Sequence, residues 1–68
     1  MKFEDIANST LAALIDEYIH NARYRKILKD RLIDGLTYAE IADLRNYSER
    51  QVKNIVYQCE SKLFSKIP

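Results

Sequence analysis

TYAEIADLRNYSERQVKNIVYQ, residues 37–58, is the stretch of the chain that decides the fold. Its two halves begin in the same way, since Thr37 is followed three residues later by Glu40 and Ser48 is followed three residues later by Gln51. In each pair the hydroxyl and the carbonyl side chain can satisfy backbone amides at the start of a helix, an arrangement called a capping box. The stretch therefore predicts two short helices joined by a tight turn.

The turn is predicted at Asn46. A helix over 38–44 that stops so soon needs a residue with a left-handed backbone, and asparagine is one of the few residues besides glycine that adopt this conformation. Ala42 is small enough for the second helix, 49–64, to cross closely. The spacing is that of a helix-turn-helix.

The predicted helix 49–64 has two chemically different faces when its residues are placed about 100° apart. Its apolar stripe consists of Val52, Ile55, Val56, Cys59 and Leu63. The opposite side carries Arg50, Lys53, Asn54 and Tyr57. Arginine and lysine can donate to guanine or phosphate, asparagine can pair with adenine, and tyrosine can offer its hydroxyl to phosphate. This face is therefore a candidate for reading bases in the major groove of DNA.

Further candidate DNA contacts surround the starts of the two helices. These residues are Thr37, Tyr38, Arg45, Ser48 and Glu49. The helix that begins after Thr37 has free backbone amides in its first turn, which suit a phosphate. The alternative is a small helical bundle with two well-capped helices and no role in nucleic-acid binding.

Two more helices are predicted upstream from apolar residues at helical spacing. The first is expected over 5–20, with His20 and Asn21 marking its break from the second helix. Its apolar stripe is Phe3, Ala7, Leu11, Leu14, Ile15 and Tyr18, with Ile19 at the edge. A later start remains open because Asn8, Ser9 or Thr10 could cap a shorter helix.

The second helix is expected over 22–34 and ends at Gly35, the only glycine of the chain and a natural helix terminator. Its apolar face consists of Tyr24, Ile27, Leu28 and Leu32. Its outer face carries Arg23, Arg25, Lys26 and Lys29. These basic residues either meet phosphates or form ordinary solvent-facing surface.

The residues DGLTYAEIADLRNYSERQVKNIV, with ARYRKIL upstream, resemble the DNA-binding region 4 of the sigma-70 family and, more loosely, LuxR-type domains. The resemblance covers roughly residues 22–63. It implies recognition of a promoter-like element and, in that family, contact with RNA polymerase. Asn46 stands in place of the usual turn glycine, and Val56 and Tyr57 stand where sigma-like domains more often have polar or basic residues. The base preference of the family therefore cannot be transferred to this chain.

At 68 residues the chain is expected to form one all-α domain, 1–68, near the lower size limit for a fold without metal or disulfides. It has no room for the separate sigma region that opens promoter DNA. The resemblance thus favours a small regulator of the kind carried by phages or mobile elements. With no membrane span or signal peptide expected, the predicted location is cytoplasmic and nucleoid-associated. The single Cys59 is expected in the core, with an intermolecular disulfide or a redox sensor as the alternative.

The net charge of +1 conceals a polarised distribution. Residues 1–19 carry four acidic and one basic residue, whereas residues 20–34 and residues 45–68 each carry five basic and two acidic residues. A chain polarised in this way can present a basic face to a polyanion despite a near-neutral total. The alternative is that these charges only solvate helix surfaces.

No enzyme, cofactor or metal-site pattern is found in the sequence, since there is no glycine-rich phosphate loop and no second histidine. The predicted function is sequence-specific binding of double-stranded DNA by a transcription regulator. The alternative is a protein-interaction module that binds RNA polymerase or another regulator without reading DNA. Apolar residues near both termini either close the bundle or form a homodimer surface; these are Phe3, Ile6, Phe64 and Ile67.

Overall fold

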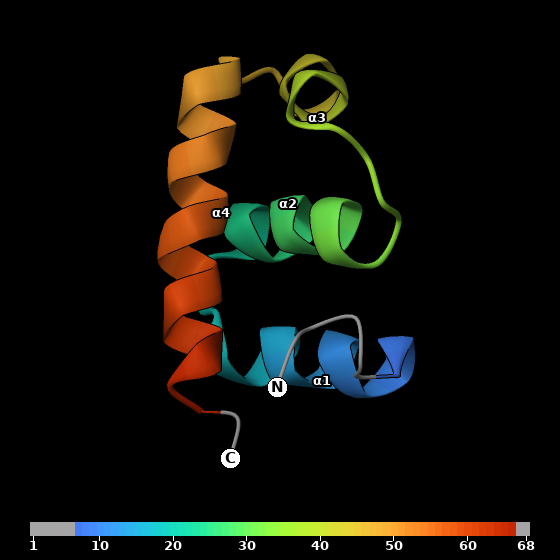
Figure 1. Cartoon of the computed structure of the whole chain (residues 1–68), viewed down its shortest axis with the longest axis vertical. Coiled ribbons are helices and arrows are strands. Elements are labelled where there is room, and N and C mark those ends of the chain that lie inside the picture. Colours follow the sequence, from blue (N-terminus) through green and yellow to red (C-terminus); the bar gives the residue numbers. More distant parts are fainter. Residues whose placement is uncertain (1–6, 67–68) are drawn as a thin grey trace.

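The computed structural model describes residues 7–66, within which there are four helices and no strand. The helices are α1 (Asn8–Tyr18), α2 (Ala22–Leu32), α3 (Tyr38–Arg45) and α4 (Glu49–Phe64). The predicted all-α class is confirmed. In Figure 1, α4 runs along one side of the molecule and α1, α2 and α3 are stacked against it one above another. Since α4 contacts each of the other three helices, it is the element that joins them into one core.

The core is formed by apolar side chains from all four helices and from the connection between α1 and α2. Its buried members are Leu11, Ile15, Ile19, Ile27, Leu28, Ile41, Ala42, Val52, Ile55, Val56, Cys59 and Leu63. They include all five residues of the stripe predicted for α4, so the outer face of that helix is also placed as predicted. Burial raises the pKa of the Cys59 thiol, which keeps it protonated and unreactive at neutral pH.

The start of α1 differs from the prediction. The expected start near Asp5, and the stripe residue Phe3, lie outside the described residues. Ala7 was expected on the apolar stripe, but it is exposed and precedes the helix with a ψ of 143°. The helix therefore begins at Asn8, with no side-chain cap, because the backbone is still extended at Ala7.

The end of α1 is set by the connection to α2. The helix stops at Tyr18, before the predicted His20, and Ile19 is extended with its side chain 3% exposed, so it belongs to the core and not to the stripe's edge. The side chain of Asn21 caps α2 by accepting hydrogen bonds from amides two and three residues later. Nη1 of Arg25 donates to the carbonyls of Ile19 (2.9 Å) and His20 (3.0 Å), which fixes the connection.

The end of α2 falls at Leu32, two residues before the predicted Asp34. The amides of Ile33 and Asp34 both donate to the carbonyl of Lys29, which marks the loss of regular helix geometry. Gly35 follows with a φ of 73°, the left-handed conformation that glycine adopts without strain. The chain therefore reverses at Gly35, as predicted, but regular helix geometry ends earlier, at Leu32.

Both predicted capping boxes are confirmed. The Thr37 amide donates to Glu40 Oε1 (2.9 Å) and the Glu40 amide donates to Thr37 Oγ1 (3.1 Å). The Ser48 amide donates to Gln51 Oε1 (2.9 Å) and the Gln51 amide donates to Ser48 Oγ (3.1 Å). The starts of α3 and α4 are therefore fixed by local side chains.

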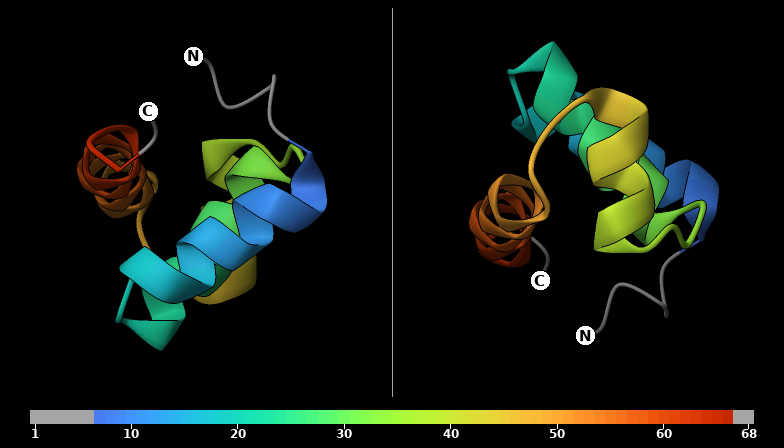
Figure 2. Two further views of the ribbon diagram at one scale, coloured as in Figure 1. Left: turned by 90° about the horizontal axis from the view of Figure 1, so that it is seen from below. Right: turned by 90° about the horizontal axis from the view of Figure 1, so that it is seen from above.

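The turn between α3 and α4 has the predicted left-handed residue. Asn46 has φ 63° and ψ 44°, and α3 runs one residue past its predicted end, to Arg45. The amides of Asn46 and Tyr47 both donate to the carbonyl of Ala42, so the last turn of α3 is closed by the reversal of the chain. Seen end-on in both views of Figure 2, α4 leaves this turn and stands to one side of the other helices.

Substitutions at Asn46 test this turn. Asn46→Gly should leave the free energy of unfolding unchanged or raise it slightly, because glycine adopts positive φ freely. Asn46→Val should lower the free energy of unfolding by about 1–2 kcal/mol, because a β-branched residue is strained there. Urea unfolding of the two variants beside the parent measures the difference. Equal stabilities for the valine variant and the parent would show that the left-handed turn is not required.

Candidate nucleic-acid interface

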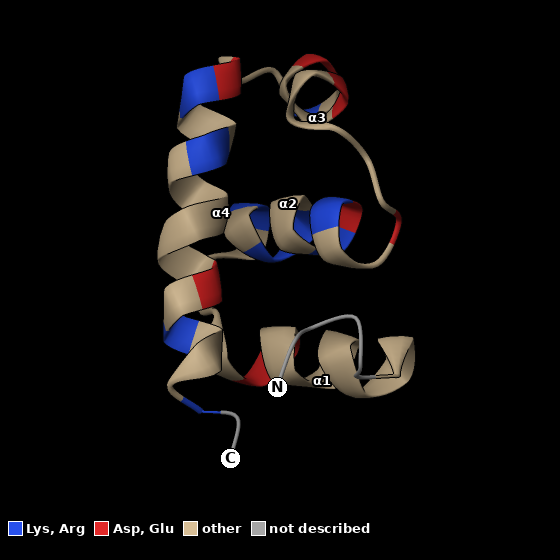
Figure 3. Ribbon diagram, viewed as in Figure 1, with Lys and Arg blue, Asp and Glu red and all other residues tan. Residues whose placement is uncertain are grey.

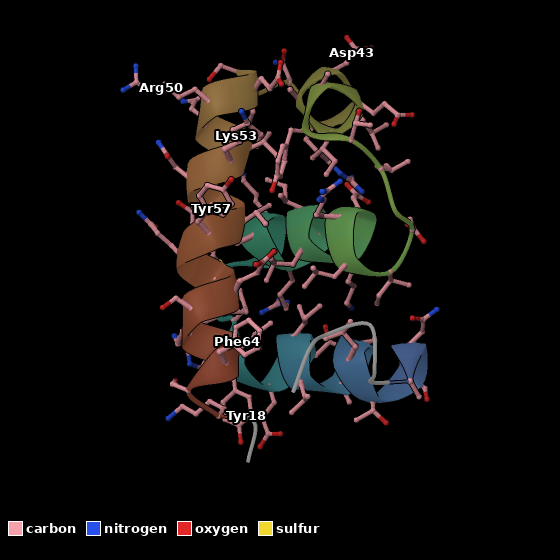
Figure 4. All side chains as sticks on the ribbon, viewed as in Figure 1. Tyr18, Asp43, Arg50, Lys53, Tyr57 and Phe64 are labelled. Atoms are coloured by element: carbon pink, nitrogen blue, oxygen red, sulfur yellow. The ribbon has the colours of Figure 1, made fainter. Side chains whose placement is uncertain are left out.

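The face of α4 turned away from the other helices is polar and accessible. Its predicted DNA-binding residues, all exposed, are Arg50, Lys53, Asn54 and Tyr57. Figure 4 shows Arg50 directed away from the body of the molecule, with Lys53 and Tyr57 following along the same helix. The burial of the apolar stripe and the exposure of this face have one cause, the 3.6-residue period of the helix.

Lysine and arginine are unevenly distributed over the four helices. Figure 3 shows the basic residues mainly along α2 and in the first turns of α4, whereas α1 has none. The two acidic residues of α1, Asp16 and Glu17, lie at the end of the molecule away from the start of α4. Exposed acidic residues also lie on α3 and in the first turn of α4, namely Glu40, Asp43 and Glu49, so the helix richest in basic residues is α2.

Tyr57 is held in place by a side chain of α3. Its ring meets that of Tyr38 edge to face, with centroids 6.3 Å apart and planes at 81°. The Arg31 guanidinium carbon lies 4.5 Å from the Tyr38 ring centroid, and Lys53 Nζ lies 5.8 Å from the same point. Burial, then a hydrogen bond with Tyr57, raises the pKa of Tyr38, so its hydroxyl stays protonated at neutral pH. Tyr38 is thus a support for the exposed residues of α4, as well as a candidate contact.

Arg45 joins α3 to α2 through an ion pair. Its Nε lies 2.8 Å from Asp30 Oδ2 and its Nη2 lies 3.0 Å from Asp30 Oδ1. The Asp30 side chain is 7% exposed and the Arg45 side chain is 32% exposed. The hydrogen bonds to Asp30 raise the pKa of the Arg45 guanidinium, which is charged in any case. The sequence predicted Arg45 as a DNA contact; the structure gives it a structural partner while leaving part of it accessible.

The start of α3 is less suited to a phosphate than predicted. The Glu40 carboxylate lies there, and the hydrogen bonds it receives from Thr37 lower the pKa of Glu40, so it is anionic at neutral pH. In the part of the chain that the structure describes, the amides of Tyr38 and Ala39 have no partner. The dipole of the helix start attracts an anion, but the neighbouring carboxylate repels it.

The start of α4 keeps two candidate groups accessible. The Ser48 hydroxyl accepts the Gln51 amide and retains its own proton to donate. Glu49 is exposed in the first turn, where its charge stabilises the helix dipole. A carboxylate at this position repels phosphates but can accept a hydrogen bond from the amino group of cytosine.

The Glu40 carboxylate provides a test of the electrostatics. Glu40→Gln retains a side-chain carbonyl for the capping box but removes the negative charge. If DNA passes the start of α3, its affinity should rise about two- to fivefold at low salt, the size expected for one exposed charge pair. Binding isotherms at two salt concentrations measure the effect. An unchanged affinity at low salt would place the DNA away from α3.

No family model, curated protein or solved structure matches this chain. Among residues 7–66, no group of three or more histidine, cysteine, aspartate or glutamate side chains could hold a metal ion. Nor does any helix of the same segment combine the length and apolar character needed to cross a membrane. The functional proposal is therefore based on the arrangement of α3 and α4 and on the outer side chains of α4.

Proposed function

We propose that this chain binds double-stranded DNA sequence-specifically, with α4 in the major groove, and that it acts as a transcription regulator. The observation that carries the proposal is the division of α4 into a buried apolar face and an exposed face with Arg50, Lys53, Asn54 and Tyr57. An exposed helix face of this composition offers donors and acceptors to base edges.

The connection between α3 and α4 supports the proposal. A short helix, a turn through left-handed Asn46 and a second capped helix resemble the parts with which helix-turn-helix proteins present a recognition helix. Arg50, Lys53 and Asn54 lie in the first two turns of α4, where recognition helices make their base contacts. Tyr57 lies one turn further on, where its ring is supported by Tyr38.

A second candidate function is contact with RNA polymerase or another regulator. The observation in its favour is Leu44 on α3, whose side chain is 61% exposed. Single exposed apolar residues are common on protein surfaces, so Leu44 identifies the position at which a protein contact is to be tested. Since Leu44 is not on the outer face of α4, the two functions are separable by mutation and are compatible in one regulator.

Selection from a random-sequence duplex pool tests the DNA-binding proposal. The parent protein should enrich a common sequence, and the double variant Arg50→Ala, Asn54→Ala should enrich none. Lys62→Ala, which removes one exposed positive charge near the other end of α4, is the control and should enrich the parent's sequence. If the duplexes that the parent retains at physiological salt share no common sequence, sequence-specific binding is rejected and the protein-interaction function is favoured.

A further inference from the structure

The basic residues on the outer face of α2 have different roles in the structure. Arg25 is bound to the two carbonyls of the α1–α2 connection, and Lys29 Nζ lies 2.7 Å from Asp16 Oδ1. The side chains of Arg23 and Lys26, by contrast, have no partner within residues 7–66. The outer face of α2 therefore contains two cations that already have partners and two that remain available.

The two available cations line a hollow of about 450 Å³ together with Arg45, Asn46 and Tyr47. The hollow lies at the seam between the first turns of α2 and the α3–α4 turn. Its third cation is held in a fixed position, because the Arg45 guanidinium makes two hydrogen bonds to Asp30. The Asp30 carboxylate also offsets the charge of Arg45, so the net positive charge of the hollow comes from Arg23 and Lys26, and Arg45 adds a preorganised donor, Nη1, that is not bonded to Asp30.

This hollow shares one lining residue with a neighbouring hollow. Tyr47 also lines a second hollow, of about 220 Å³. The other walls of the second hollow are Tyr24, Gln51, Asn54, Ile55 and Gln58. Asn54, on the outer face of α4, thus lines a hollow that shares Tyr47 with the hollow of the three cations. A DNA strand whose bases face α4 would carry its phosphates along this margin of the helix.

We propose that the hollow lined by Arg23, Lys26 and Arg45 binds one phosphodiester of the DNA backbone, on the strand that passes beside α4. The inference rests on the proposed function and deepens it. Contacts of this kind fix the register of a recognition helix on the duplex and carry no base information. The other margin of α4 faces the start of α3, where the Glu40 carboxylate disfavours a phosphate. The two margins are therefore unequal, and the tight phosphate contact falls on the side of α2.

The test compares two double variants that lose the same charge. Arg23→Ala, Lys26→Ala empties the hollow of its two available cations, whereas Lys62→Ala, Lys66→Ala removes two exposed cations at the far end of the chain. The Arg23→Ala, Lys26→Ala protein, called the hollow variant, should bind a duplex selected by the parent about tenfold more weakly, as expected for the loss of charge-assisted hydrogen bonds. The slope of log affinity against log salt should also fall by about 1, the contribution of one phosphate. The affinity of the control, Lys62→Ala, Lys66→Ala, should fall less than about threefold. Both double variants should have the melting temperature of the parent.

Duplexes with a single neutral methylphosphonate locate the contact. One backbone position should weaken binding of the parent about tenfold, and the hollow variant should be insensitive to that same position. If both double variants lose affinity equally, or if no methylphosphonate position distinguishes the hollow variant from the parent, the hollow is not a phosphate site. The proposed function would then still stand where Arg50→Ala and Asn54→Ala weaken binding. A parent that selects no duplex would overturn both proposals.

Discussion

Replacing Arg45 with methionine is expected to lower the free energy of unfolding by about 3–5 kcal/mol. The substitution leaves the Asp30 carboxylate, 7% exposed, without its partner, and an uncompensated buried charge costs this much in proteins. The loss is comparable with the whole stability that a core of this size usually provides. The variant should therefore be largely unfolded at 25 °C, as urea titration or a melting curve followed by circular dichroism would reveal.

Two further variants separate the ion pair from the packing around it. Asp30→Leu combined with Arg45→Met replaces both charges by apolar groups and should recover most of the lost stability. Asp30→Ala alone should cost less than Arg45→Met, because the Arg45 side chain is already 32% exposed and can be solvated by water. If Arg45→Met unfolds at the same urea concentration as the parent, the pair contributes nothing to the fold. Arg45 then becomes an ordinary surface cation.

Truncation of the buried face of α4 should produce the second large effect. Ile55→Ala should lower the free energy of unfolding by about 2–5 kcal/mol, because the side chain is 8% exposed and its removal leaves a cavity. Gln58→Ala, on an exposed position of the same helix, is the matched control and should change stability by no more than about 0.5 kcal/mol. Chemical denaturation of both variants provides the comparison. Similar losses of unfolding free energy in Ile55→Ala and Gln58→Ala would contradict the division of α4 into a buried and an exposed face.

The features predicted correctly from the sequence depend on contacts within a few residues. The capping boxes of Thr37 and Ser48 and the left-handed Asn46 are local, so their residue types alone determine where α3 and α4 begin and where the turn falls. The same holds for the two faces of α4, which follow from the helical period. At α1 the equivalent signal was weak, because its start at Asn8 has no side-chain cap and Ala7 could be read as part of the apolar stripe.

The features missed from the sequence depend on how separate helices meet. Asp30 and Arg45 are fifteen residues apart, and a buried carboxylate cannot be told from a surface one before α2 and α3 are placed together. The contact of Tyr38 with Tyr57 was missed for the same reason, because it depends on how α3 and α4 are placed relative to each other. Among the candidate DNA-binding residues, helical period identified the exposed members of α4, but it could not show that Arg45 is paired. The dimer residues Phe3, Ile6 and Ile67 lie outside the described part of the chain, and Phe64 is 45% exposed.

The most direct test of α4 as the DNA-reading helix is a binding isotherm beside a melting curve for Arg50→Ala and for Asn54→Ala. On a duplex selected by the parent, each variant should lose about 1–3 kcal/mol of binding free energy, the size of one bidentate base contact. For Asn54→Ala, affinity for unrelated duplexes should change much less than affinity for the selected duplex. The melting temperatures of both variants should match that of the parent, because the two side chains are exposed. If both variants bind the selected duplex as tightly as the parent does, α4 is not the reader.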